Sequence, residues 1–292
     1  MIYYADMKQV LELSLLALLF CGVLKGASTE EQLLVGALSQ PKFWSGVHAA
    51  EYLMELNRAG DAVDGFILRH QNSFVVPVTR IGLWRVTALR CRATCKQDEY
   101  ERTLTLIRSI AFADENPTDR IHAVETLFKL RYFCNEEEQR RLRHFCGDEE
   151  CPALLKIYSA ALLAWSSPEE GAGELTRLFR QYRDDASCRL VMLVVLQNFA
   201  RLPDELLKEI AEVQSNAKYA ASRVAASRIL LRHRRLFVEQ VLADLPPSAE
   251  AMRLLLEFAP KSRECQAMIR LLMKSDSLEL RMLVAFAKLS IE

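Results

Sequence analysis

A short apolar segment recurs along the chain at intervals of about 35 residues, and this periodicity limits the possible folds more than any other feature. "GVHAAEYL" (46–53) returns as "RIHAVETL" (120–127), with a His three residues before a Glu in both copies. The steps between the early apolar residues of successive copies are 36, 38, 36, 33 and 34 residues, and a last gap of 58 residues holds one degraded copy, "EAMRLLLEF". These anchor residues are Val47, Leu83, Ile121, Ile157, Leu190, Val224 and Met282. Repetition at this period is typical of stacked helical pairs.

A second amphipathic segment lies between successive copies. "YERTLTLIRSIAF" and "DELLKEIAEV" are two examples, with apolar residues three and four positions apart and charges on the other face. Prolines separate the segments, and in "NPTDRIHAVETL" Pro117 begins a helix that Thr118 or Asp119 can cap. Runs rich in Val, Ile and Thr are scarce, so strands are not expected. The sequence therefore predicts an all-α solenoid of about eight helix–turn–helix repeats.

One copy of the repeat carries a family resemblance. The segment "NPTDRIHAVETLFKL" resembles the HEAT repeat, in particular its phycobilisome-lyase-like subtype, in which an Asp precedes a basic and an apolar residue, then small residues and a Leu. The matching residues are Asp119, Arg120, Ile121, Ala123 and Leu127. "KFWSGVHAAEYL" is more faintly similar to a HEAT-like region of bacterial proteins, sometimes found alongside sulfatases. The resemblance implies a right-handed α-solenoid of about eight HEAT-like repeats, and it specifies a fold rather than an activity.

The N-terminal 27 residues differ in kind from the rest. A mostly apolar run, Leu13–Leu24, is short for a membrane span but suits the apolar part of a secretory signal. We therefore expect residues 1–27 to be a signal peptide, cleaved near Gly26 or Ala27, and residues 28–292 to be a single HEAT-like solenoid with no membrane span. The protein would then be exported to the periplasm or cell envelope. Alternatively, the run is the first buried helix of a cytoplasmic protein.

Composition argues against several classes of function. Lys plus Arg and Asp plus Glu both number 38, so the chain lacks the basic excess of a general nucleic-acid binder. It has no glycine-rich nucleotide loop. Seven Cys follow Cys21 at irregular spacing, which is neither a disulfide framework nor a zinc motif. We expect no nucleic-acid partner, no cofactor and no metal.

Two His–Glu pairs are the strongest argument for an enzyme. Deoxyhypusine hydroxylase, a HEAT-like protein, binds two irons through His–Glu pairs, and similarity to it would make His48, Glu51, His122 and Glu125 candidate ligands. In that enzyme the His and Glu are adjacent, whereas here two residues separate them, and two pairs supply only four groups. Helices packed about 9–10 Å apart would place the two pairs roughly 20 Å from each other, too far to share an ion. A hydrogen bond within one helix turn explains each pair without metal.

The second helices of a solenoid form a continuous concave wall, where such proteins usually bind partners. Arg and aromatic residues are favoured in binding sites, and here they concentrate near the anchors of the N-terminal half. The predicted partner-binding residues are Trp44, His48, Glu51, Arg80, Trp84, Arg85, Arg120, His122, Glu125 and Tyr158. Trp44 and Trp84 can equally be core residues.

We therefore expect a non-enzymatic scaffold or adaptor that binds a protein or peptide on its concave face. The alternative is an envelope accessory protein that binds a glycan or a partner hydrolase such as a sulfatase, because aromatic planes beside Arg and Glu suit sugars as well as peptides. A metal-dependent enzyme on a HEAT scaffold is the third hypothesis.

Overall fold

The structure is a computed structural model and describes residues 28–77, 79–112, 116–216, 218–242 and 245–291. The predicted signal peptide, residues 1–27, lies outside the described residues. The described residues form helices and turns and contain no strand, which confirms the all-α fold.

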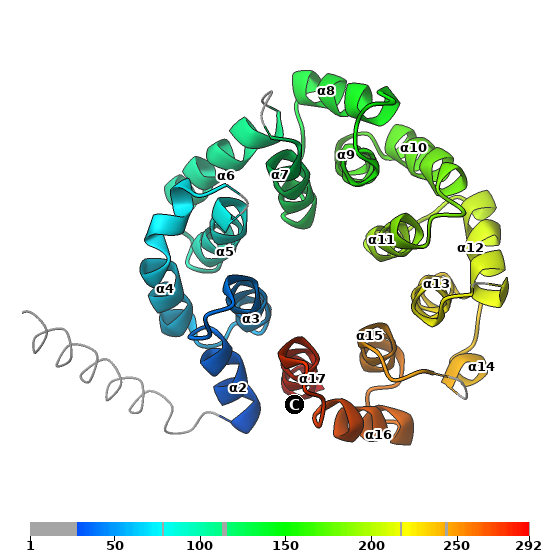
Figure 1. The fold of residues 1–292 in the computed structure, drawn as a ribbon. Helices are drawn as coiled ribbons and strands as arrows, with labels where there is room; N and C mark the ends of the chain where they lie inside the picture. Colours follow the sequence, from blue (N-terminus) through cyan, green and yellow to red (C-terminus); the bar gives the residue numbers. More distant parts are fainter. Residues whose placement is uncertain (1–27, 78, 113–115, 217, 243–244, 292) are drawn as a thin grey trace, which may run out of the picture.

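The helices alternate between an outer and an inner layer (Figure 1). The outer layer contains α2 (Thr29–Ala37), α4 (Gly60–Arg69), α6 (Gln97–Ala111), α8 (Glu136–Gly147), α10 (Pro168–Gln181), α12 (Asp204–Asn216), α14 (Glu239–Leu242) and α16 (Arg263–Leu272). The inner layer contains α3 (Phe43–Glu55), α5 (Thr79–Ala93), α7 (Pro117–Lys129), α9 (Ala153–Ser166), α11 (Ala186–Leu196), α13 (Ala220–Arg232), α15 (Ala249–Phe258) and α17 (Leu278–Ile291). A short 3-10 helix, η1 (Gln71–Val75), joins α4 to α5. All the anchor residues of the sequence repeat lie in inner helices, and the degraded copy forms α15.

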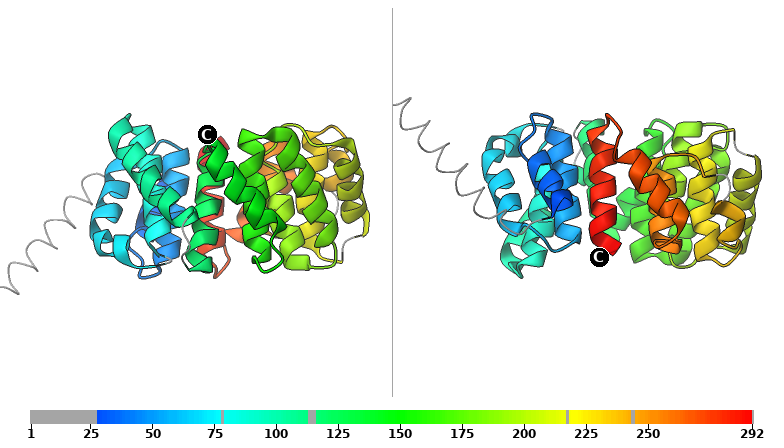
Figure 2. Two further views of the ribbon diagram at one scale, coloured as in Figure 1. Left: turned by 90° about the horizontal axis from the view of Figure 1, so that it is seen from above. Right: turned by 90° about the horizontal axis from the view of Figure 1, so that it is seen from below.

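The inner helices form a closed ring. Each packs against the next from α3 through to α17, and α17 packs in turn against α3 and α2. Figure 1 shows this ring along its axis, and Figure 2 shows it edge-on, with the helices running between its two faces. A straight solenoid would hold its first and last repeats far apart, whereas here they are in contact.

A continuous apolar core joins the first and last helical pairs. Leu34 and Val35 of α2 belong to the same buried cluster as Met282, Ala285 and Leu289 of α17. Because this apolar surface is removed from water only when the two ends meet, it supplies the main driving force for ring closure.

Polar and aromatic contacts fix the register of the two ends. Lys288 of α17 forms an ion pair with Glu30 of α2. Ser45 Oγ of α3 donates a hydrogen bond of 3.0 Å to Glu279 Oε1 of α17. The rings of Tyr52 and Phe286 stack with centroids 4.8 Å apart. These contacts are directional, so they select one alignment of α17 against α2 and α3.

The start of α7 differs from the prediction in one respect. Pro117 does begin the helix, but Asn116 provides the cap, by accepting a hydrogen bond from the Thr118 N–H. Asp119 is fully buried, and Arg80 of α5 donates to its Oδ2 from Nε at 3.1 Å and from Nη2 at 2.7 Å. The Asp119 carboxylate therefore ties two neighbouring inner helices together.

Within the described residues, no helix combines the length and apolar character needed to cross a membrane.

Ring closure predicts that a change in the last helix weakens the first. Met282→Ala is expected to lower the free energy of unfolding by about 2–5 kcal/mol, because it leaves a cavity in the shared core. Hydrogen exchange should show reduced protection of amides in α2 as well as in α17. The matched control is Leu271→Ala in α16, a Leu that is 52% exposed and whose loss should have little effect. Unchanged protection of α2 in Met282→Ala would contradict the closed ring.

Candidate functional site

Eight side chains from four neighbouring inner helices gather on the inner wall of the ring, and we call them the inner-wall cluster. They are Trp44, His48, Glu51, Arg85, His122, Glu125, Lys129 and Tyr158, from α3, α5, α7 and α9. All of them except Lys129 are among the residues that the sequence predicts to bind a partner.

Arg85 occupies the centre of the inner-wall cluster. Its side chain is only 3% exposed, and a guanidinium is rarely so buried without a partner. Its Nε donates to Glu51 Oε1, and its Nη1 donates to Thr126 Oγ1 at 3.4 Å. Burial by itself would raise the pKa of Glu51, but the Arg85 charge and the hydrogen bond with His48 outweigh burial and lower this pKa to about 2. One guanidinium thus links α3, α5 and α7 and keeps Glu51 ionised.

Each His is oriented by the Glu that follows it by one helix turn, as expected from the sequence. His48 Nδ1 lies 3.1 Å from Glu51 Oε2, and His122 Nδ1 lies 3.4 Å from Glu125 Oε2. Lys129 Nζ lies 2.7 Å from the other oxygen of Glu125. Burial acts to raise the pKa of Glu125, but His122 and Lys129 outweigh it, so this pKa lies well below its usual range. Both carboxylates are therefore ionised and already paired.

Trp44 brings the two His–Glu pairs closer together than the sequence analysis estimates. The centroid of its ring lies 6.5 Å from that of His48 and 5.7 Å from that of His122, so the imidazoles are separated by no more than the sum of these distances, about 12 Å. The estimate of roughly 20 Å is therefore wrong. A Cβ on Gly82 of α5 would lie 2.8 Å from the Trp44 ring. Because Gly82 has no side chain, the indole of α3 lies across α5 and approaches α7.

Each of the two imidazoles has one nitrogen without a protein partner. Nδ1 of His48 and of His122 is within hydrogen-bond distance of a carboxylate, and neither Nε2 is hydrogen-bonded within the described residues. His48 and His122 are 44% and 31% exposed. Metal-binding His residues have the same orientation, but no three His, Cys, Asp or Glu side chains converge in the part of the chain that the structure describes. The two Nε2 atoms are therefore partly exposed and not engaged by any described residue.

Two tyrosines supply hydroxyl groups to the inner wall. Burial raises the pKa of Tyr158, and the nearby charge of Glu125 raises it further. Burial also raises the pKa of Tyr52, against the opposing charge and hydrogen bond of Arg253 from α15. Both phenols therefore stay protonated at neutral pH.

A hollow of about 640 Å³ adjoins the inner-wall cluster at one mouth of the ring. Glu51, Arg85 and Lys129 of the cluster line it, together with Glu55, Arg92, Ala93, Arg131 and Asn198. Apart from Arg85, which lies in the middle of α5, these residues lie at or near the C-terminal ends of α3, α5, α7 and α11, so four inner helices meet there. Burial and the charge of Glu51 raise the pKa of Glu55. The lining includes four cations and two carboxylates, so its charge is positive.

Three predicted site residues lie apart from the inner-wall cluster. Arg80 is held by Asp119, with its guanidinium 5.9 Å from the ring centroid of Trp84. Trp84 is 7% exposed and belongs to the main core. The Arg120 guanidinium lies over the ring of Phe145 in the outer helix α8. These residues join repeats to one another and are not available on the inner wall.

The sequence reasoning missed several residues that line the inner wall. Lys129 follows Glu125 by four residues, a spacing that favours an ion pair and could have identified it. Arg253 lies in the degraded repeat copy, so no anchor marked it. Arg92 and Arg131 lie at the ends of two neighbouring inner helices, and no repeat anchor indicated that these ends share one hollow.

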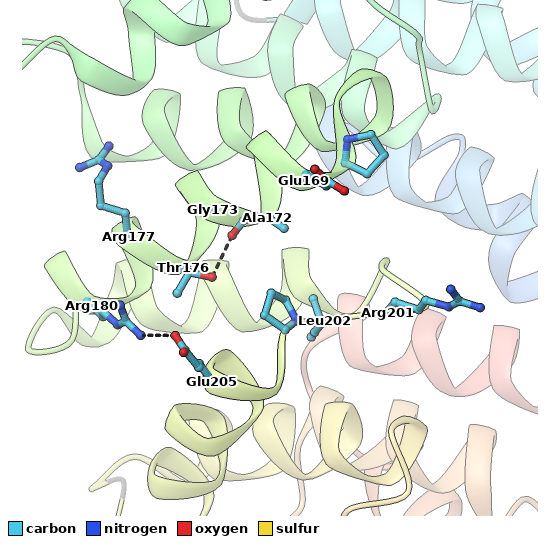
Figure 3. A pocket seen from close by; sticks show the side chains of 11 residues that line it. Glu169, Ala172, Gly173, Thr176, Arg177, Arg180, Arg201, Leu202 and Glu205 are labelled. Carbon is cyan, nitrogen blue, oxygen red and sulfur yellow. Dashed lines mark hydrogen bonds and ion pairs between the residues drawn. The ribbon is translucent and has the colours of Figure 1, made fainter.

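A second hollow, of about 820 Å³, lies on the outside of the ring between α10 and residues 201–205 (Figure 3). Most of its polar groups already have a hydrogen-bond or ion-pair partner. Thr176 Oγ1 donates to the Ala172 carbonyl at 2.8 Å, and Arg177 Nη2 donates to the Cys146 carbonyl at 3.0 Å. Arg180 forms an ion pair with Glu205 at 3.6 Å. The inner hollow offers more unengaged groups, and we consider it the candidate site.

Comparisons of the chain with family models, with characterised proteins and with solved structures give no match. The HEAT-repeat resemblance therefore stays a prediction, and the function has to be argued from the geometry of the site.

The buried pair of Arg85 and Glu51 predicts strong coupling in a double-mutant cycle. Arg85→Met should cost about 3 kcal/mol of stability, because it leaves a mostly buried carboxylate without its cation. The double variant with Glu51→Gln should regain most of that loss, since no unpaired charge remains. Urea unfolding of the four proteins measures the coupling. The control is Arg143→Met, whose exposed pair with Glu170 on the outer layer should contribute less than about 1 kcal/mol. Additive effects at Arg85 and Glu51 would rule out a direct pair.

The low pKa of Glu51 predicts a pH window for its contribution to stability. The folded-state pKa is about 2, against 4.5 for an ordinary Glu, so the folded state favours the ionised form. The contribution is therefore complete above about pH 5 and is lost as the pH falls through about 2. Carboxyl ¹³C chemical shifts should show Glu51 becoming protonated only as the pH falls toward 2, well below the ordinary midpoint of a glutamate. A midpoint near 4.5 would show that Arg85 does not hold this carboxylate.

Proposed function

We propose that this protein is a non-enzymatic binding protein whose inner wall holds an extended segment of a partner polypeptide. The observation that supports this most directly is the hollow beside the inner-wall cluster, where side chains from four inner helices converge. Helix-borne groups are held rigidly, and a rigid wall lowers the entropy lost when a flexible segment binds.

The chemistry of the wall supports binding rather than catalysis. Efficient general acids and bases have a pKa near the working pH. The pKa of Glu51 is lowered to about 2, that of Glu125 is lowered as well, and that of Tyr158 is raised. These groups do not exchange protons near neutral pH, but they make fixed hydrogen-bond donors and acceptors.

The size and polarity of the hollow favour a polypeptide segment. Its volume of about 640 Å³ lies within the range of small-ligand pockets, about 300–1,000 Å³, and is too small for a folded domain. Donors such as Arg92 and acceptors such as Glu55 line it. Main-chain amides and carbonyls of an extended segment match such a mixed surface.

The glycan alternative has less support. A sugar-binding site of the expected kind uses an exposed aromatic plane. The Trp44 indole packs against Gly82, and Trp84 is buried in the core. A partner hydrolase such as a sulfatase stays compatible with the proposal, because the polypeptide segment held on the inner wall can belong to such an enzyme.

We also propose that residues 1–27 direct export, on the sequence evidence alone. N-terminal sequencing of the protein recovered from the periplasm tests this, with a new terminus near residue 27 or 28 as the expected result.

A photo-crosslinking residue placed at Ala93, inside the hollow, tests the binding function. One defined segment of a partner should be captured, and a synthetic peptide of that segment should bind purified protein with one-to-one stoichiometry in calorimetry. Ala93→Trp fills the hollow and should abolish that binding. The matched control is Gly173→Trp, which fills the second hollow, on the outside of the ring (Figure 3). A Cβ at Gly173 would meet no atom within 4 Å, so the substitution has room. A peptide that binds Ala93→Trp as tightly as the unmodified protein would disprove an inner-wall site.

A further inference from the structure

We propose that the polypeptide segment held on the inner wall is acidic, and that Arg92 and Arg131 bind its carboxylates at the mouth of the hollow. This inference rests on the proposed binding function and names the chemistry of the partner.

Two guanidiniums at this mouth lack the carboxylate partners that are common elsewhere in the chain. Arg92 and Arg131 are both exposed, both line the hollow, and neither forms an ion pair with a described residue. By contrast Arg85 pairs with Glu51, and Lys129 pairs with Glu125. The charge that stays available to a ligand at the mouth is therefore carried mainly by guanidinium groups, which bind carboxylates through two parallel hydrogen bonds.

Two of the carboxylates near the mouth are already paired with cations. Glu51 is held by Arg85, and Glu125 by Lys129. Glu55 is the exposed carboxylate of the lining; burial and the charge of Glu51 raise its pKa, against the opposing charge of Arg253. With four cations and two carboxylates, the lining stays positive.

An aromatic stack holds Arg131 in place. Its guanidinium lies 5.6 Å from the ring centroid of Trp165. The Trp165 ring stacks with Phe128 at 5.8 Å and with Phe199 at 5.0 Å, and since these two rings are 6.2 Å from each other, the three aromatic rings form a triangular cluster. Trp165 Nε1 donates to the Phe128 carbonyl at 3.2 Å, which fixes the indole. A guanidinium stacked on an aromatic plane keeps its N–H edges available for an acceptor. Arg131 is therefore positioned before any ligand arrives.

The backbone at Arg131 favours glycine. Its φ is 55°, in the left-handed region, where it ends α7 with hydrogen bonds from Arg131 N to Phe128 O and from Tyr132 N to Leu127 O, both 3.0 Å. Glycine is the usual residue at this position of a helix end. A cation near a helix C-terminus also interacts favourably with the helix dipole, but that interaction requires only that the charge lie close to the last carbonyls of the helix. It does not account for a side chain held over Trp165 and lining the hollow.

Fluorescence anisotropy with three labelled eight-residue peptides tests the inference directly. The peptides alternate Ser with Glu, with Gln or with Lys. We expect the Glu peptide to bind most tightly and its affinity to fall as salt is added. The double variant Arg92→Gln/Arg131→Gly should reduce that affinity about tenfold, while its thermal unfolding temperature is not lowered, because Gly suits the left-handed backbone.

The matched control is Arg201→Gln. Arg201 is an exposed residue of the second hollow, on the outside of the ring, so this change should leave the affinity unchanged. Equal binding of the three peptides, or an equal loss in Arg201→Gln, would overturn the inference. A single-stranded decanucleotide that displaces the Glu peptide at lower concentration, with the same sensitivity to Arg92 and Arg131, would also overturn it, since phosphate would then be the group recognised.

The outcome is separable from that of the crosslinking at Ala93. A neutral or basic segment captured there, and excluded by Ala93→Trp, would preserve the binding function and refute its acidic partner. Failure to capture any segment at Ala93 would remove the binding function itself.

Discussion

The packing of α17 against α2 and α3 is the contact on which the other features of the inner wall depend. Stacked helical pairs contact only their neighbours, so a small rotation between pairs accumulates along the chain. When the last pair meets the first, the rotation between successive pairs is no longer free to vary. The apolar face of α2, which carries Leu34, and that of α17, which carries Met282, must share one core. Closure thereby sets the curvature of the whole inner layer and the direction in which its side chains point.

Electrostatic pairing on the inner wall has an orienting role rather than a stabilising one. A buried ion pair contributes little net stability compared with apolar residues of the same volume. Arg85, however, contacts Glu51 on one neighbouring helix and Thr126 on the other, so three inner helices are held in one register. The same contact leaves Glu51 free to orient His48 through its second oxygen. The geometry of the wall therefore depends on these pairs more than the stability of the ring does.

The helical pairs could be predicted from the sequence, because the 35-residue period reports directly on which residues face a neighbouring helix. The His–Glu hydrogen bonds were predictable as well, since they depend only on spacing within one helix. Closure was not, because it depends on small rotations that no single residue determines. The predicted separation of His48 from His122 was too large, because it assumed that α5 keeps α3 and α7 apart by its full diameter. At Gly82, α5 has no side chain, so Trp44 of α3 lies across it and approaches His122. Arg253 escaped notice for the related reason that its repeat copy is degraded.

A closed ring also limits what can reach its inner wall. An open solenoid accepts a partner from the side along its whole concave face, whereas a ring admits one only through its two mouths. The hollow at one mouth is too small for a folded domain, so the proposed binding function requires a slender segment such as a terminus or a loop. Under that proposal the segment meets the exposed guanidiniums of Arg92 and Arg131 before it meets the paired charges deeper on the wall. Charge at the mouth would then govern the rate and selectivity of entry, and the deeper hydrogen-bonding groups would govern how long the segment stays.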